Sequence, residues 1–532
     1  MTDPIEGGVI SVRASNALFE FFMIEVNAKW EYLLDPHIDT HDNVQRRSSL
    51  LLSTILFCAS KFGSYTDGEI TPAPDPFLQS RLCSLARNLA IRSIAEGNRS
   101  IEAMQAFYLL VCWKDADDDV SYLHSGYAFR VLHDLDLEQD DGDGRQMARR
   151  KRLWLALFRQ DRQQSMFFMR RASLSPGDWD TSVLCDLNVW LKMQCALPTD
   201  FVACCSANLR HIQSKLRHTA QKATPVMLPY LLELMDAELS SWRTKWCNHL
   251  EGEGRAQAND DPSISSTLLY PGKQHLTTLV NIWENGIRLN IGSAILRQAL
   301  LASVTSLSGH HQGPNPPLDI NLSTFQECLS PSLPGLTSSV EGAFETLRQL
   351  MNIQPDDLRR SPDAILLLAP NSALFLCLLL CLPGEGVLGP AFQGTAVTLI
   401  RDISDHIRRA IQSPQDTVAL HSAYLESLVE LLDSPTSQSA SAQQGLRVQP
   451  PFDMANMSVD TNGMDFDDPT FQAAQVLADG IGSHGDALPP NESIFGVSGE
   501  PFQNLHLQSL ANLLDGQLFW EAPSAGDDIR FA

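Results

Sequence analysis

Apolar residues recur at the spacing of an α-helix along most of this chain, and this recurrence constrains the fold more than any other feature. Between positions 101 and 168 three such segments follow one another. Alternating strand patterns bounded by hairpin signals are scarce, so the sequence predicts an all-α fold. The residues that mark the three apolar stripes are Ile101, Met104, Tyr108, Val111 and Cys112; Leu123, Tyr127, Val131 and Leu135; and Trp154, Ala156, Leu157, Phe158, Met166, Phe167 and Phe168.

The chain divides into a large helical part and an acidic tail. Of its 532 residues, 44% are hydrophobic and 19% are charged, which is typical of globular proteins. Helical spacing continues to Leu432, and beyond Ser434 the composition changes to Ser, Gln, Asp, Gly and Pro. From Gln438 onward two Arg oppose thirteen Asp and Glu, a net charge of -11. We therefore expect a multi-helix domain over residues 5–433 and a disordered acidic tail over residues 434–532.

Charge and cysteine content exclude several classes of protein. The net charge of -24 argues against non-specific nucleic-acid binding, which needs an excess of Lys and Arg. The N-terminus lacks the basic and apolar regions of a secretory signal, so the eleven cysteines are expected to be reduced thiols. The apolar run from Ile365 to Leu382 approaches membrane-spanning length, but Pro370 and Asn371 interrupt it and no basic flank orients it. We expect a buried helix there and no contact with a membrane.

Two consecutive segments carry a recognisable pattern. The stretch SIEAMQAFYLLVCWKDADDDVSYLHSGYAFRVLHDLDL begins at Ser100, and RRKRLWLALFRQDR begins at Arg149. SLSPGDW follows at Ser173, and Leu34-Asp35-Pro36 lies upstream. In this order they resemble the middle homology region of fungal binuclear zinc cluster transcription factors. The matching residues are Trp113, Gly126, Ala128, Arg130, His133, Leu135 and Leu137, then Arg149, Arg152, Trp154, Asp161 and Arg162.

The resemblance implies a nuclear regulator of RNA polymerase II transcription and not an enzyme. The family's DNA reader holds two zinc ions with six cysteines. This chain has no cysteine before Cys58 and no Cys-x-x-Cys pair. We therefore expect no cofactor, zinc entering only through a cluster encoded upstream of Met1, and contact with DNA only indirectly or through such a module. Homodimers or heterodimers with zinc cluster factors are implied partners. An alternative is a coregulator that lacks DNA binding and pairs with complete family members.

The signature residues are interpreted as packing residues. Asp161 lies seven positions after Trp154 and so shares its helical face, where a carboxylate needs a partner such as Arg162 or Arg130. Gly126 is expected to allow close approach between helices. The basic run Arg149, Arg150, Lys151 and Arg152 could be a nuclear import signal or a phosphate contact. The favoured interpretation is an exposed first turn of a helix.

Two polar clusters suggest metal chemistry, and each has a simpler explanation. His37, Asp39, His41 and Asp42 could ligate a metal, but we expect a loop whose Asp or Thr side chains cap the next helix. The acidic run at positions 115 and 117–119 could hold magnesium in an all-α diphosphate-handling enzyme. The rest of that motif is missing, so a solvated helix start is favoured.

The tail mixes acids with large apolar residues. Leu510, Leu513 and Leu514 form an LxxLL pattern, and Leu507, Leu510 and Leu514 share one helical face. Such segments are typical of activation regions that fold against a groove of a coactivator or mediator-type protein. The alternative is a terminal helix that docks on the chain's own core. The predicted activation residues are Phe466, Phe471, Leu510, Leu513, Leu514, Phe519 and Trp520.

Overall fold

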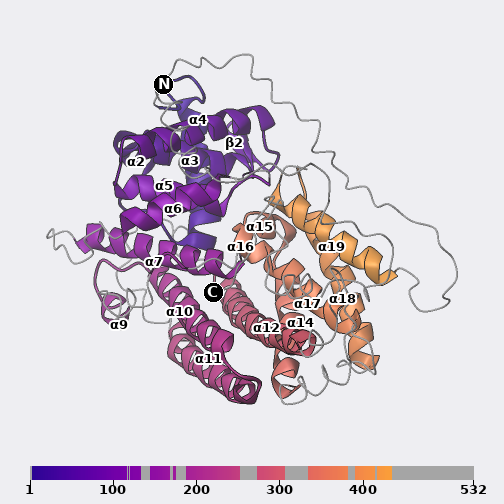
Figure 1. Ribbon diagram of the computed structural model, residues 1–532. Helices are drawn as coiled ribbons and strands as arrows, with labels where there is room; N and C mark the ends of the chain where they lie inside the picture. The colour runs from indigo at the N-terminus through magenta and orange to yellow at the C-terminus, as the bar shows by residue number, and fades with distance from the viewer. Residues whose placement is uncertain are drawn as a thin grey trace, which may run out of the picture.

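The fold was analysed in a computed structural model of the chain (Figure 1). It describes residues 3–116, 118, 120–132, 144–167, 172–174, 187–251, 272–305, 333–381, 390–413 and 416–433. The elements in chain order are α1 (Val12–Phe21), the π-helix η1 (Phe22–Glu31), α2 (His41–Arg47), α3 (Ser49–Ser60), β1 (Ser64–Thr66), β2 (Glu69–Thr71), α4 (Pro76–Ala95), α5 (Ile101–Cys112), α6 (Ser121–Leu132), α7 (Gly144–Phe167), α9 (Leu187–Trp190), α10 (Asp200–Lys222), the 3-10 turn η3 (Pro225–Met227), α11 (Leu228–Glu251), α12 (Lys273–Thr305), α14 (Leu333–Met351), α15 (Pro355–Arg359), α16 (Asp363–Leu366), α17 (Leu368–Cys381), α18 (Pro390–Arg409) and α19 (Thr417–Asp433).

Helix α7 lies between two groups of helices. It packs on α5 and α6 on one side and on α10 on the other, and α10 in turn packs on α11 and α12 (Figure 1). The later helices α14, α17, α18 and α19 pack on one another, and α14 and α17 also pack on α12. One continuous cluster of buried apolar side chains runs through both groups, from Ile10 to Leu428. Burial of this apolar surface supplies the main driving force for folding.

A rigid turn follows the first long helix. Helix η1 ends at Tyr32, whose φ of 57° is unusual for a residue with a side chain. The Asn27 side chain compensates, because its Oδ1 accepts from the N–H groups of Leu33 (3.0 Å) and Leu34 (2.8 Å). Its Nδ2 donates to the carbonyl of Leu34 at 3.0 Å. These bonds fix the direction in which Asp35 leaves the helix.

The segment from α15 to α19 is bonded to the N-terminal helices. The indole Nε1 of Trp113 donates to the carbonyl of Arg360 at 3.0 Å, and Arg360 pairs with Glu25 at 2.7 Å. Arg359 donates to the carbonyl of Lys61 (2.5 Å) and pairs with Asp416 at 3.0 Å. Two parts of the chain that are more than 240 residues apart are therefore joined by directional bonds as well as by the core.

The structure confirms the all-α fold. Its one sheet among the described residues is a short antiparallel hairpin, in which Ser64 pairs with Thr71 and Thr66 with Glu69. Asp67 and Gly68 form its turn with φ of 54° and 100°, a conformation that Asp-Gly favours. The apolar run from Ile365 is buried in α16 and α17. Within the described part of the chain, no helix is long and apolar enough to cross a membrane.

Two glycines let α12 and α14 approach closely. A Cβ on Gly292 would overlap the side chain of Ser339, and a Cβ on Gly342 would lie 3.1 Å from both the Cβ of Arg288 and the carbonyl oxygen of Asn285. Gly394 in α18 has open space around it, with nothing within 4 Å of such an atom. The close α12–α14 contact is therefore possible because Gly292 and Gly342 have no side chain.

Replacing Gly292 by Ala should destabilise the fold by about 1–3 kcal/mol, because a methyl group must be forced between two packed helices. Gly394→Ala is the matched control, and it should stabilise by up to about 1 kcal/mol through helix propensity. Chemical denaturation of both variants measures the difference. Equal effects of the two substitutions would show that α12 and α14 are not in tight contact.

Candidate functional site: a buried charge network on α7 and a groove beside α14

Helix α7 carries a row of buried arginines on one face. Arg149, Arg152 and Arg159 are 2%, 1% and 7% exposed, and their spacing of three and seven places them along one side of the helix. Each binds carboxylates from segments that are distant in sequence. Because buried charges require partners, this face of α7 can be buried only when the segments that carry the carboxylates lie beside it.

Arg152 forms the centre of the network. Its Nε and one terminal nitrogen bind Asp200 in α10 at 2.6 Å and 2.9 Å, a two-pronged contact that suits the planar guanidinium. The other terminal nitrogen binds Asp35 at 2.8 Å. All three side chains are fully buried. Burial opposes the charge, but attraction to the two carboxylates outweighs it and raises the pKa of Arg152 above its ordinary value.

Arg149 extends the network toward α5 and the loop before α2. It pairs with Asp39 at 2.9 Å and with Glu102 at 3.0 Å. Asp39 also pairs with Arg47 at 2.5 Å and accepts the N–H of Asp35 at 2.9 Å. Asp35 and Asp39, both in the loop that follows η1, thus attach this loop to α7.

Arg159 binds the end of η1. It donates to the Glu31 carboxylate at 2.7 Å and to the hydroxyl of Ser206 in α10 at 3.3 Å. Tyr108 in α5 donates its hydroxyl to the same carboxylate and accepts from Arg159 at 3.2 Å. Burial raises the pKa of Tyr108 well above its usual value, so its proton stays in this bond at neutral pH. Four helical segments therefore meet at one guanidinium.

Asp161 is buried, and its main partners are backbone groups. Its two oxygens accept the N–H of Ser173 at 2.7 Å and the N–H of Leu174 at 3.1 Å. Arg162 lies at 3.7 Å, so it is the closer of the two arginines proposed from the sequence. Burial raises the pKa of Asp161 despite these bonds. The carboxylate thus holds the short segment 172–174 against α7.

The sequence interpretation of the basic run is wrong. Arg149, Arg150, Lys151 and Arg152 are all less than 9% exposed. Carboxylates pair with Arg149 and Arg152 in the interior, and the Lys151 ammonium lies over the Trp190 ring at 5.9 Å. The run cannot be read by an import receptor while the domain is folded. The interpretation of Gly126 is also wrong: it is exposed, and nothing lies within 4 Å of where its Cβ would be.

Other signature residues divide between core and surface. Trp113 (4% exposed) packs edge-on against Phe22, with ring centroids 6.3 Å apart. Trp154 (5% exposed) stacks on Phe158 at 5.1 Å. Arg130, by contrast, is exposed and lies away from Asp161's bonds. The signature is therefore mainly, but not wholly, a set of core residues.

The two polar clusters are occupied by structural contacts. The side chain of Thr40 accepts the N–H of Asn43 and caps α2, as expected for the first cluster. Asp115 pairs with Lys61 at 2.6 Å, and Asp118 pairs with Arg87 at 3.1 Å while accepting the N–H of Val120. These two carboxylates are only 16% and 6% exposed, so the expected solvated helix start is wrong for them.

Asp117 and Asp119 lie outside the described residues. Throughout the described segments, no group of three His, Cys, Asp or Glu side chains is arranged to hold a metal ion.

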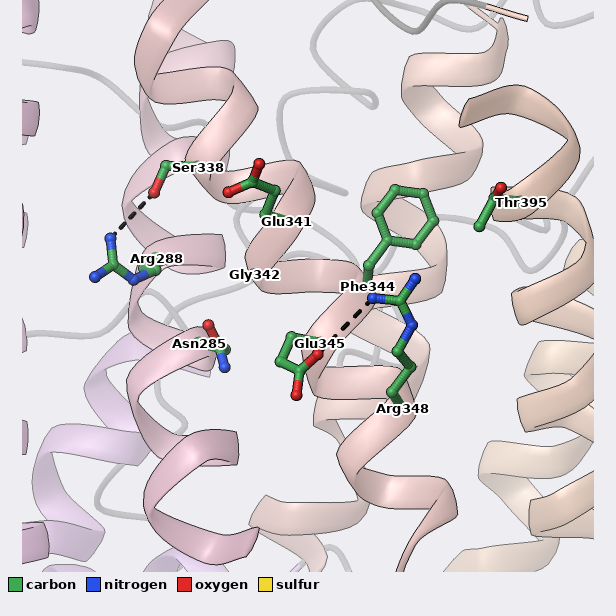
Figure 2. Close-up of a pocket in the computed structure, with 9 residues that line it drawn as sticks. All are labelled: Asn285, Arg288, Ser338, Glu341, Gly342, Phe344, Glu345, Arg348 and Thr395. Atoms are coloured by element: carbon green, nitrogen blue, oxygen red, sulfur yellow. Dashed lines mark hydrogen bonds and ion pairs between the residues drawn. The ribbon is translucent and has the colours of Figure 1, made fainter. Parts of the chain in front are cut away.

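A groove of about 670 Å³ lies along α14 between α12 and α18 (Figure 2). Gly342 of α14 lines the groove, and because it has no side chain, α12 and α14 can approach closely there. The wall on α12 carries Arg288, which bonds the hydroxyl of Ser338 at 3.1 Å. Arg348 and Glu345 on α14 pair with each other at 3.8 Å. The groove is lined by both charges, and its lining residues are Asn285, Arg288, Ser338, Glu341, Gly342, Phe344, Glu345, Arg348 and Thr395.

Comparison with models of known protein families identifies the domain that contains the charge network. Residues 27–281 match the family model described as the fungal specific transcription factor domain. The chain carries this domain. Proteins of this kind regulate transcription in fungi and are not enzymes, and the domain implies a nuclear protein in general. No curated protein and no solved structure matches the chain.

The charge network belongs to the fungal specific transcription factor domain. Glu31, Asp35, Asp39, Arg152 and Asp200 all lie within the matched residues 27–281. The groove does not, because it is formed by α12, α14 and α18 beyond or at the end of the match. The predicted activation residues, from Phe466 to Trp520, lie outside the described residues.

Sequence reasoning missed most partners in the network. Leu34-Asp35-Pro36 was part of the resemblance, but no signal linked Asp35 to Arg152, 117 residues away. Glu31, Glu102, Arg159 and Asp200 were not singled out. A count of charged residues on the apolar faces of η1, α5, α7 and α10 could have found them, because such charges must pair.

Removing Arg152 should cost about 3–5 kcal/mol of folding free energy, since Arg152→Ala leaves Asp35 and Asp200 buried without a counter-ion. Arg152→Lys keeps the charge but cannot form the two-pronged contact with Asp200 and also bind Asp35. Its free energy of unfolding should therefore lie between those of the wild type and Arg152→Ala. Arg92, whose side chain is 55% exposed and pairs with Glu96, gives the control Arg92→Ala. Urea denaturation that failed to separate the two alanine variants would refute the central place of Arg152.

Proposed function

We propose that this fungal transcription regulator is an activator and that its acidic C-terminal tail supplies the activating contact. The proposal rests on the sequence of residues 438–532, where a net charge of -11 accompanies two clusters of large apolar residues. Such a segment lacks the composition to form its own core but can fold on a partner's groove. Acids attract the partner at long range, and the apolar residues supply affinity on burial.

The helical domain supports this division of labour. Its described helices are joined by one apolar core and by buried ion pairs, whereas the tail has the composition of a segment that needs a partner to bury its apolar residues. Coactivator or mediator-type proteins are the proposed partners of the tail. Pairing with a second copy or with a complete zinc cluster factor is the proposed route to DNA, and the nucleus is the proposed site of action.

The tail should activate transcription by itself. Fused to an unrelated DNA-binding domain, residues 438–532 should switch on a reporter gene. Replacing Leu510, Leu513, Leu514, Phe519 and Trp520 by Ala should remove most of that activity, since each buried side chain contributes about 1–3 kcal/mol. Replacing four tail Asp residues by Asn should remove less.

The competing possibility is a tail that docks on its own domain. The isolated tail would then be inert, and the same five substitutions in the full chain would lower its melting temperature. That pair of results would overturn the activation proposal.

We also propose that this chain holds no structural zinc and has little DNA affinity of its own, since it contains no Cys-x-x-Cys pair. Elemental analysis of the purified chain should find no stoichiometric zinc. Binding to duplexes that contain CGG should be weak at physiological salt, given the net charge of -24. Tight and salt-sensitive binding by this chain alone would contradict the proposal.

A further inference from the structure

A buried arginine without a carboxylate partner lies between α7 and α10. Arg210 in α10 is 6% exposed, and within the described part of the chain it donates one side-chain hydrogen bond, to Gln213 at 2.6 Å. No carboxylate of the described residues pairs with it. Burial and the neighbouring Arg159 lower the pKa of Arg210 to about 10, so it is still a cation at neutral pH.

Its surroundings are cationic and rich in donors. Ser206, Arg210 and Arg217 share the face of α10 that meets α7, since Ser206 accepts from Arg159 at 3.3 Å and Arg217 donates to the carbonyl of Ser165 at 3.4 Å. Among the residues that the structure describes, the carboxylate that Arg159 binds is Glu31. The Nε of Arg159 is also buried and has no acceptor among the described residues. Among the described residues, Arg210 therefore adds a positive charge with which no carboxylate pairs, and the neighbouring Arg159 has an N–H donor to spare.

A lone buried cation is costly, and an arginine cannot escape the cost by losing its proton. Its planar fork matches the oxygens of a carboxylate or a phosphate. We propose that Arg210, with Arg159 beside it, anchors a binding site for a small oxyanion that enters the seam between α7 and α10. Such a ligand would tighten the contact between α7, which carries the charge network, and α10, which supplies Asp200 to it. A metabolite-sized phosphate or carboxylate could thereby regulate the domain, whether or not the tail activates.

The test compares anions on the purified full chain. Inorganic phosphate and citrate are titrated in separate arms while melting temperature is followed, with potassium chloride at matched ionic strength as the reference. A ligand that binds only the folded state raises the melting temperature with its concentration. We expect a saturable rise with at least one of the two anions, and the arm that responds identifies the chemistry. A response no larger than that of chloride in both arms would overturn the site.

Two substitutions connect the response to Arg210. Arg210→Met fills the same space without charge, so the ligand-free protein should melt at the same or a higher temperature and the saturable response should disappear. Lys215→Met is the matched control on the same helix, because Lys215 is 55% exposed and pairs with Glu238 outside the seam. It should keep the response. Arg210→Lys keeps the charge without the fork and should raise the apparent Kd about tenfold or more. An undiminished response in Arg210→Met would place the anion elsewhere.

Discussion

The fold depends on a three-way contact between Arg152 and the carboxylates of Asp35 and Asp200. Each residue comes from a different part of the chain, and none of the three can be buried alone at an acceptable free-energy cost. The contact therefore fixes the order of η1, α7 and α10 around one point. Apolar packing would tolerate a shift of one helix along another, whereas a two-pronged ion pair does not. The network therefore favours the observed register of these three segments over shifted ones.

The neighbouring contacts repeat this logic at intervals along α7. Arg149 meets Asp39 and Glu102, and Arg159 meets Glu31 and Tyr108. Together they line the face of the helix with bonds whose partners come from the first 110 residues or from α10. Helix α7 thus contacts both groups of helices. A substitution of one of its buried arginines would therefore disturb the packing of both groups.

The sequence predicted the helices well because apolar spacing is a local property. Positions such as Met104 and Tyr108 could be assigned to a buried face without knowing what covers them. The charged residues could not, because Arg149 and Arg152 look like solvent-facing residues until Asp35, Asp39 and Asp200 are placed beside them. Gly126 failed for the opposite reason: a glycine in a helix suggests close packing, yet the close α12–α14 contact uses Gly292. Pairing across more than a hundred residues leaves no periodic trace in the chain.

The bond from Trp113 to the carbonyl of Arg360 has a consequence for where this molecule can be divided. The family match ends at residue 281, but the apolar core continues through α14, α17, α18 and α19 to Leu428. A fragment cut at the family boundary would expose the surface that these helices cover and would strand the indole N–H. The unit recognised by sequence comparison is therefore smaller than the unit that folds, and the later helices are an integral wall of it.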